Sequence, residues 1–209
     1  MTFDLIVFGA FTRLTDSGLG CPDWPGCYGT SNPFHALSDI QQAESAMPTG
    51  PVTVIKAWIE MIHRYLAMTV GALILVQVGI TFTKLKSLGK TPLLGSFGLL
   101  LLVCVQGAFG AWTVTLKLQP IIVTIHLMLA LVLLAFLTAY AQQSWEDKFS
   151  SVRAIRVRPL SAQLLAISFV VLFTQVFLGA WVSTNYAVLA CPDFPTCLGS
   201  AWPETNWGE

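Results

Sequence analysis

Four long stretches of the chain contain no Asp, Glu, Lys or Arg and are rich in Leu, Val, Ile, Ala and Gly. They run over residues 65–83, 91–116, 118–145 and 159–192. A helix needs about 20 largely apolar residues to cross the hydrocarbon layer of a bilayer, and Pro, Gly or charge bounds each stretch. The pattern predicts four complete membrane-spanning helices, at about 53–84, 92–113, 120–142 and 160–184.

The N-terminus carries a shorter apolar run, residues 5–12. At about 1.5 Å of rise per residue, this run gives only about 12 Å of helix, which does not span a membrane. It also lacks the basic leader and cleavage site of a signal peptide. We expect it to be the outer end of a first span whose beginning lies outside the sequence.

Composition agrees with a membrane protein, because 55% of the residues are hydrophobic and only 11% are charged. A soluble domain usually has about 25% charged residues. The formal net charge is zero and the sequence has no dense basic patch, so nothing in the electrostatics supports nucleic-acid binding.

Basic residues gather in two of the connections between the predicted spans. These residues are Lys84, Lys86 and Lys90 in one connection and Lys148, Arg153, Arg156 and Arg158 in the other. Because Lys and Arg accumulate in short cytoplasmic loops, both connections are expected inside the cell. Residues 13–58, 113–119 and 185–209 are then expected on the outer side.

The chain contains an internal repeat at an offset of 170 positions. Residues 9–29 align with residues 179–199 without a gap, and nine of the 21 positions are identical. Duplication predicts an all-α integral membrane protein of two related four-helix bundles. Residues 1–145 form the first bundle, with a partial first helix and an outer cysteine loop at 13–52. Residues 146–158 form a cytoplasmic linker, and 159–209 form the first helix and outer cysteine loop of the second bundle. Further spans are expected beyond both ends.

Three polar side chains precede the uncharged part of the second helix. Glu60, His63 and Arg64 stand at i, i+3 and i+4 and share one helical face. Ionisable groups at such depth usually face a bundle interior or cavity, which makes them candidates for function. The alternative is an interfacial ion pair of Glu60 and Arg64 beside a solvated histidine.

His126 lies six residues after Pro120 in an apolar run, so His63 and His126 both lie near the outer ends of their helices. Two neutral imidazoles at similar depth suit axial ligation of a haem iron between apolar walls. A helix-to-helix hydrogen bond is the alternative for His126 alone. Zinc fits less well because it needs more ligands at one point, and the methionines Met61, Met68 and Met128 are more usual as packing.

Arg64 and Arg13 are candidates to bind haem propionates, because a guanidinium forms bidentate bonds with carboxylates. The alternative for both is interfacial snorkelling. His35 is expected to be an ordinary loop residue, and Cys104 a small buried hydrophobe.

The remaining cysteines form two pairs, Cys21 with Cys27 and Cys191 with Cys197, each with five residues between its members. All four are expected on the outer side, where disulfides persist. We therefore expect one disulfide in each loop. A structural staple and a thiol-relay role both remain open, although the spacing differs from the C-x-x-C of thioredoxin-like motifs.

Taken together, these motifs strongly resemble the haem A synthase family over nearly the whole chain. The matching segments are GAFTRLTDSGLGCPDWPGC at 9–27, EMIHR at 60–64, QGAFGAWTV at 106–114, TIHL at 124–127, GAWVSTN at 179–185 and CPDFPTC at 191–197. The resemblance implies an eight-span enzyme of the bacterial inner membrane that oxidises a methyl group of haem O to the formyl group of haem A.

By the same resemblance, His63 and His126 correspond to haem-ligand histidines, Glu60 to a catalytic carboxylate, and the cysteines to the outer-loop pairs. Haem b is implied only at a second histidine pair, about 170 positions further on and past Glu209. The expected partners are haem O, the lipid bilayer, haem O synthase, oxidase assembly factors and an electron donor, with homo-oligomerisation left open.

Two other functions fit some of the same residues. A bis-histidine haem b protein that only transfers electrons would use His63 and His126 in the same way. A membrane thiol oxidoreductase would also combine a four-helix bundle with cysteines on the outer side.

Overall fold

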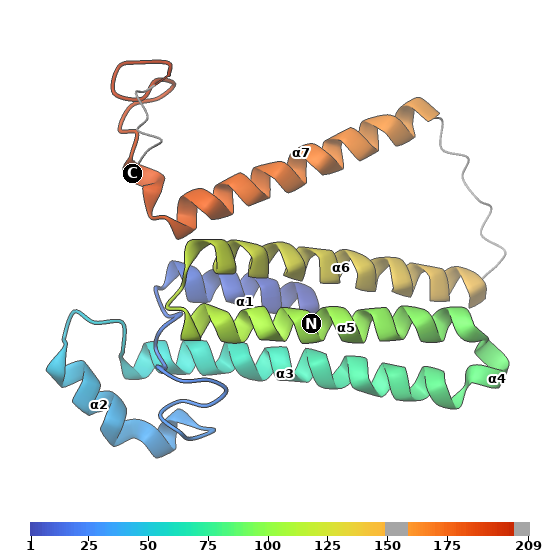
Figure 1. The fold of residues 1–209 in the computed structure, drawn as a ribbon, viewed down its shortest axis with the longest axis horizontal. Coiled ribbons are helices and arrows are strands. Elements are labelled where there is room, and N and C mark those ends of the chain that lie inside the picture. Colours follow the sequence, from blue (N-terminus) through green and yellow to red (C-terminus); the bar gives the residue numbers. More distant parts are fainter. Residues whose placement is uncertain (149–158, 203–209) are drawn as a thin grey trace.

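The computed structural model describes residues 1–148 and 159–202, and the chain in these ranges is helical, with no strand assigned (Figure 1). The helices are α1 (Thr2–Leu14), η1 (Pro33–Ala36), α2 (Leu37–Ala46), α3 (Val54–Thr83), α4 (Leu85–Leu88), α5 (Lys90–Thr115), α6 (Pro120–Lys148), α7 (Pro159–Thr184) and η2 (Ala187–Leu189). Arg153, Arg156 and Arg158 of the predicted linker, and Glu209, lie outside the described residues.

Four of these helices are long and apolar enough to cross a membrane. They are α3, α5, residues 120–143 of α6, and α7, with mean hydropathies from 1.9 to 2.7. Large apolar side chains cover their outer faces: Leu101 of α5, for example, is 68% exposed. In a bilayer these faces contact lipid tails, while every backbone group inside a helix is satisfied internally. The prediction of an all-α membrane protein is therefore confirmed.

The helices α1, α3, α5 and α6 lie side by side and form a closed four-helix arrangement (Figure 1). The helix α3 packs against α1 and α5, and α6 packs against α5, α1 and α7. A small apolar core of Val70, Ile74, Leu99 and Leu133 joins α3, α5 and α6. The helix α7 diverges from α6, but a hydrogen bond of 3.3 Å between Thr124 and Thr184 joins these two helices near the end that carries the cysteine loops.

The helices η1 and α2, in the first cysteine loop, were not predicted. The Asn32 side chain accepts a hydrogen bond of 2.9 Å from the Phe34 N–H, and Pro33 occupies the first helical position. An Asn cap followed by Pro is a recognised helix start. Ile40 of α2 is fully buried against the loop cysteines and α3, so this short helix closes one side of the cysteine loop.

Candidate functional site

His63 lies on α3 with its ring against α1. The ring is nearly parallel to that of Phe8, with 6.4 Å between the ring centroids. A Cβ atom added at Gly9 would lie 2.9 Å from the Cε1 atom of His63. The absence of a side chain at Gly9 therefore creates the space that the imidazole occupies.

His126 lies on α6 in a matching environment. A Cβ atom added at Gly110 of α5 would lie 3.2 Å from the His126 Cε1 atom. Gln106 lies one turn before Gly110 on α5, and its side chain donates a hydrogen bond of 3.0 Å to the backbone carbonyl of His126. His63 therefore packs from α3 against α1, and His126 packs from α6 against α5, within the same four-helix arrangement.

The region around these rings contains buried polar atoms that lack partners. In the described part of the chain, the buried side-chain nitrogen and oxygen atoms without a hydrogen bond are His63 Nδ1, His126 Nδ1 and Gln106 Oε1. Buried polar groups are nearly always paired, and an unpaired one needs an explanation. Imidazoles that make no bond to the protein are available to a ligand, and they suit a haem because each ring offers one nitrogen lone pair.

A zinc site gains no support from the geometry. Among residues 1–148 and 159–202, the His, Cys, Asp and Glu side chains form no group of three or more that could hold a metal ion. A structural zinc site needs four such ligands, and a catalytic one three.

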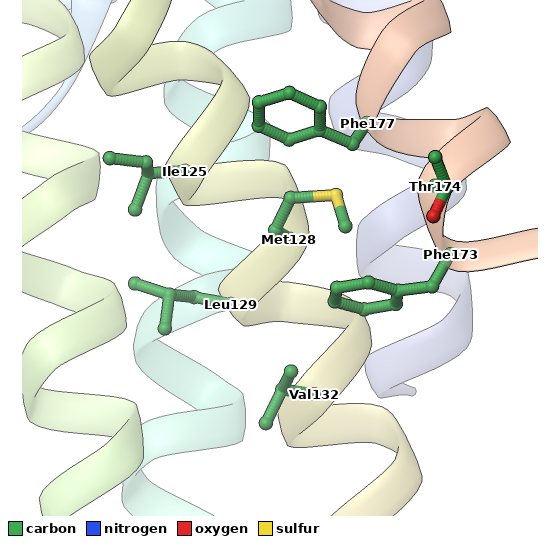
Figure 2. Close-up of a pocket in the computed structure, with 7 residues that line it drawn as sticks. All are labelled: Ile125, Met128, Leu129, Val132, Phe173, Thr174 and Phe177. Carbon is green, nitrogen blue, oxygen red and sulfur yellow. The ribbon is translucent and has the colours of Figure 1, made fainter. Parts of the chain in front are cut away.

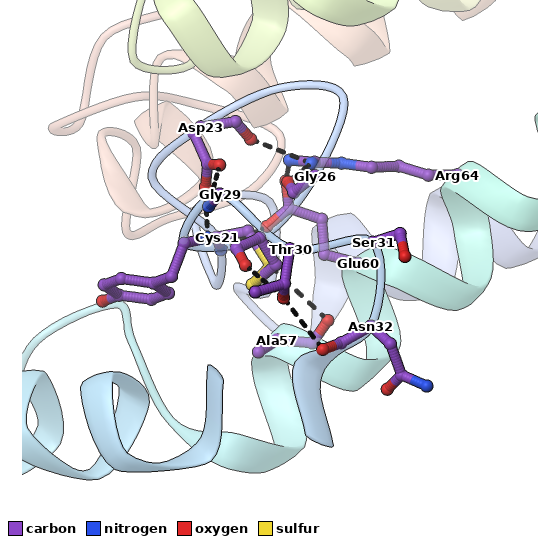
Figure 3. Close-up of a disulfide and its surroundings, with 12 residues drawn as sticks. Cys21, Asp23, Gly26, Gly29, Thr30, Ser31, Asn32, Ala57, Glu60 and Arg64 are labelled. Carbon is purple, nitrogen blue, oxygen red and sulfur yellow. Dashed lines mark hydrogen bonds and ion pairs between the residues drawn. A yellow bond between two sulfur atoms is a disulfide. The ribbon is translucent and has the colours of Figure 1, made fainter. Parts of the chain in front are cut away.

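Glu60 and Arg64 form a buried ion pair on α3, with only 4% and 8% of their surfaces exposed (Figure 3). The Arg64 Nη1 group donates to the carbonyl oxygens of Asp23, Pro25 and Gly26, at 2.8 Å and 3.2 Å for the first two. The second carboxylate oxygen of Glu60 accepts the Cys21 N–H at 2.8 Å. Both side chains therefore hold the first cysteine loop, and propionate binding by Arg64 stays a prediction.

The first cysteine loop is compact. Cys21 and Cys27 are bonded, with 2.07 Å between their sulfur atoms, and both residues are fully buried. The Asp23 carboxylate accepts the N–H groups of Tyr28 and Gly29, at 2.6 Å and 2.7 Å. Partial burial raises the pKa of the Tyr28 hydroxyl above its usual range, and the nearby carboxylates of Asp23 and Asp39 raise it further.

The second cysteine loop repeats this internal structure. Cys191 and Cys197 are bonded, with 2.09 Å between their sulfur atoms. Asp193 accepts the N–H groups of Leu198 and Gly199, at 2.7 Å and 2.9 Å. A further hydrogen bond from the Thr196 hydroxyl is the main reason that the pKa of Asp193 lies below its usual range.

Arg13 contacts Asp16, 3.9 Å from its Nη1 atom, and the C-terminal end of α7. Its Nη2 group donates to the Ser183 carbonyl at 2.7 Å, and its guanidinium carbon lies 4.5 Å from the centre of the Tyr186 ring. Tyr186 in turn contacts Asp16 at 3.3 Å. The residues in each hydrogen-bonded pair are 170 positions apart, which is the offset of the sequence repeat. Arg13 therefore joins equivalent positions of the two repeats, and its predicted propionate contact stays untested.

An apolar cavity of about 430 Å³ separates α6 from α7 (Figure 2). It is lined by Ile125, Met128, Leu129, Val132, Phe173, Thr174 and Phe177. Met128 thus faces this cavity, whereas Met61 is buried beside the loop cysteines.

His35 and Cys104 are exposed, so the expectation that Cys104 is buried was wrong. A free cysteine behaves as a small hydrophobe, so an exposed thiol is tolerated on an apolar spanning helix such as α5.

Sequence reasoning missed Phe8, Gly9, Gln106 and Gly110 as parts of the site. Only Gln106 carried a usable signal, because an amide inside an apolar membrane span needs a partner. Gly9 and Gly110 carried no such signal in the sequence. The role of a glycine that lies opposite a ring on another helix becomes clear only when the packing of the helices is known.

The contact between the first loop and α3 gives a testable prediction. A Cβ atom at Gly20 would lie 2.5 to 2.6 Å from backbone atoms of Lys56 and Ala57. We expect Gly20→Ala to destabilise the protein by about 1–3 kcal/mol, because backbone atoms of a helix cannot move aside as a flexible side chain can. Unfolding in detergent measures this change. Gly71→Ala in α3, where the added Cβ meets nothing within 4 Å, is the control and should show no loss.

Comparison with known proteins agrees with the sequence motifs. The chain is 41% identical over 204 residues to the Heme A synthase of Shewanella oneidensis. This alignment covers 95% of the chain and 58% of that relative. It is 30% identical to the Heme A synthase of Caulobacter vibrioides, over 97% of the chain and 63% of the relative. The chain thus spans about three fifths of the length of the curated relatives that it matches.

No solved structure matches the chain. The family model for COX15-CtaA, described as cytochrome oxidase assembly protein, matches residues 1–208. This match covers both cysteine loops, both histidines and all the described helices. The chain therefore belongs to the COX15-CtaA family of cytochrome oxidase assembly proteins.

Proposed function

We propose that this chain forms the haem O-binding part of a haem A synthase, which oxidises a methyl group of haem O to a formyl group. The conversion removes two hydrogen atoms from the methyl carbon and adds one oxygen atom. The observation that supports this proposal best is the pair of half-buried imidazoles, His63 and His126, whose buried Nδ1 atoms make no hydrogen bond to the described protein. The relatives named Heme A synthase support the same reaction.

In this proposal His63 on α3 and His126 on α6 would hold the porphyrin, and the oxidising equivalent would be generated at or near its iron. The protein positions the reacting methyl group and keeps water away. Gly9 and Gly110 allow the imidazoles to lie close to the neighbouring helices, and Phe8 lies parallel to one ring. Small residues opposite both ligands therefore set their positions.

Glu60 is the proposed catalytic carboxylate. It lies one turn before His63 on α3 and is almost completely buried, with Arg64 as its charge partner. A fixed negative charge at this position would stabilise positive charge that develops on a nearby substrate, and it could also accept or return a proton. Both roles require the carboxylate rather than an amide.

Replacing Glu60 by Gln tests this role. The protein is expressed from its native gene in bacteria that make haem O but lack their own haem A synthase, and extracted haems are separated by chromatography. We expect Glu60→Gln to lower haem A formation by about 100-fold or more, which is typical for a lost acid–base or electrostatic group. Glu44→Gln in α2 is the matched control and should keep wild-type conversion. Full conversion by Glu60→Gln would remove Glu60 from the mechanism.

The same extraction separates the proposed enzyme from an electron-transfer protein. A bis-histidine haem b protein would use the same histidines, but its deletion would leave haem A present. The thiol oxidoreductase alternative is rejected if replacing Cys21 and Cys27 by serine leaves haem content and activity unchanged. We further propose, from the distribution of Lys and Arg, that both cysteine loops face the outer side of the cell membrane.

A further inference from the structure

The two cysteine loops provide an internal comparison within one chain. In each loop an Asp carboxylate accepts hydrogen bonds from two backbone N–H groups. The second cysteine of each loop also forms an isolated antiparallel β-bridge, Cys27 with Thr30 and Cys197 with Ser200. The internal structure of the two loops is therefore the same. Any difference in their exposure must come from what surrounds them.

Their exposure differs strongly. Cys21 and Cys27 are 0% exposed, whereas Cys191 is exposed. The aromatic residues at equivalent positions follow the same trend, since Trp24 is 47% exposed and Phe194 is 98% exposed. The first loop is thus docked against α3, whereas no helix equivalent to α3 follows the second loop within the described residues.

Among the docking contacts of the first loop, which include a hydrogen bond from the Tyr65 hydroxyl to the Ser31 carbonyl, the largest polar group involves one ion pair of α3 (Figure 3). Arg64 donates to three loop carbonyls, those of Asp23, Pro25 and Gly26. Glu60 joins Arg64 to the N–H of Cys21, the first cysteine of the disulfide. Arginine suits this position because its planar guanidinium directs several N–H groups at once, and bonds with charged partners are stronger than neutral ones.

We propose that Arg64, with Glu60 as its charge partner, docks the cysteine loop onto α3 and so protects the Cys21–Cys27 disulfide from thiols. A disulfide is broken when a thiolate attacks one of its sulfur atoms, and attack requires access. Because Cys21 and Cys27 are fully buried, the loop must leave α3 before a thiolate can reach them. The ion pair therefore controls the rate of reduction. This inference does not depend on haem binding, so it and the proposed function can fail separately.

The rates of reduction of the two disulfides test the proposal. The purified chain in detergent is treated with dithiothreitol, which becomes a cyclic disulfide as it passes two electrons and two protons to the protein disulfide. Samples are quenched in acid, the new thiols are labelled with a maleimide, and peptide mass spectrometry assigns them to each pair. In the wild type we expect Cys191–Cys197 to be reduced at least about tenfold faster than Cys21–Cys27, in line with their access.

Arg64→Met should raise the rate for Cys21–Cys27 by about tenfold or more and leave Cys191–Cys197 unchanged in the same molecule. Lys117→Met removes a positive charge from the exposed α5–α6 connection and should change neither rate. Equal rates for the two wild-type disulfides would overturn the proposal. So would an unchanged Cys21–Cys27 rate in an Arg64→Met protein that is monodisperse and helical by circular dichroism.

If Arg64→Met does not fold, Arg64→Lys decides the question. A lysine keeps the positive charge beside Glu60, but its ammonium group cannot reproduce the fork of the guanidinium. We expect the Cys21–Cys27 disulfide of this variant to be reduced several times faster than in the wild type. A wild-type rate would show that the loop does not depend on Arg64.

Discussion

Replacing His63 or His126 by leucine is expected to lower the affinity of the protein for haem by more than about 100-fold. Even residues that only orient a metal ligand typically contribute about 10- to 100-fold to affinity, so loss of a ligand itself should have a larger effect. Leucine fills a similar volume and cannot bind iron, which keeps the packing between α1, α3, α5 and α6. Titration of haem into the purified variants, followed by absorbance, measures the change.

The third histidine of the chain provides the control for these variants. His35 lies in η1 of the outer loop and is exposed, so His35→Leu should bind haem as the wild type does. Wild-type affinity in both His63→Leu and His126→Leu would contradict the assignment of these residues as ligands. A loss in all three variants would point to a general effect on folding instead.

The second large effect is expected from two small substitutions, Gly9→Ala and Gly110→Ala. Alanine is favoured over glycine inside a helix by up to about 1 kcal/mol, so neither change should weaken its own helix. The added methyl groups, however, would lie 2.9 Å from His63 Cε1 and 3.2 Å from His126 Cε1. The rings must therefore move, and a displacement of about 1 Å at a reacting centre can lower turnover by about 100-fold. The yield of haem A in cells measures this loss.

Gly107→Ala is the matched control for this experiment. Gly107 lies on α5, one turn before Gly110, and a Cβ atom added there meets nothing within 4 Å. Its alanine variant should keep wild-type turnover and gain slightly in stability. Equal turnover in all three alanine variants would show that the spaces beside the two rings do not matter. The expected order is wild-type activity for Gly107→Ala, a moderate loss for Gly110→Ala and a larger loss for Gly9→Ala.

The sequence predicted the parts of this structure that depend on local patterns. Long uncharged stretches specify spanning helices because burying charge in lipid is costly. The similar depth of His63 and His126 could be predicted because both follow the start of a helix at the same end of the bundle. The spacing of Glu60 and Arg64 likewise predicted a shared face, and the structure contains their ion pair.

The sequence did not predict what these charges contact across the fold. The partners of Arg64 in the cysteine loop lie 38 to 41 positions earlier, and that of Arg13 lies 170 positions later. Contacts at such separations depend on how loops fold back, which no local period encodes. The propionate role of Arg64 was predicted from the chemistry of the guanidinium alone. Its hydrogen bonds to the loop carbonyls depend on the folded loop and were therefore found only in the structure.

The central claim is that His63 and His126 bind the same haem iron. Electron paramagnetic resonance and near-infrared magnetic circular dichroism of the haem-loaded ferric protein test it directly, because they distinguish iron with two imidazole ligands from iron with one or none. The account predicts a low-spin bis-imidazole signal that disappears in both His63→Leu and His126→Leu. A wild-type spectrum without two imidazole ligands, or a bis-imidazole signal that persists in either variant, would contradict it.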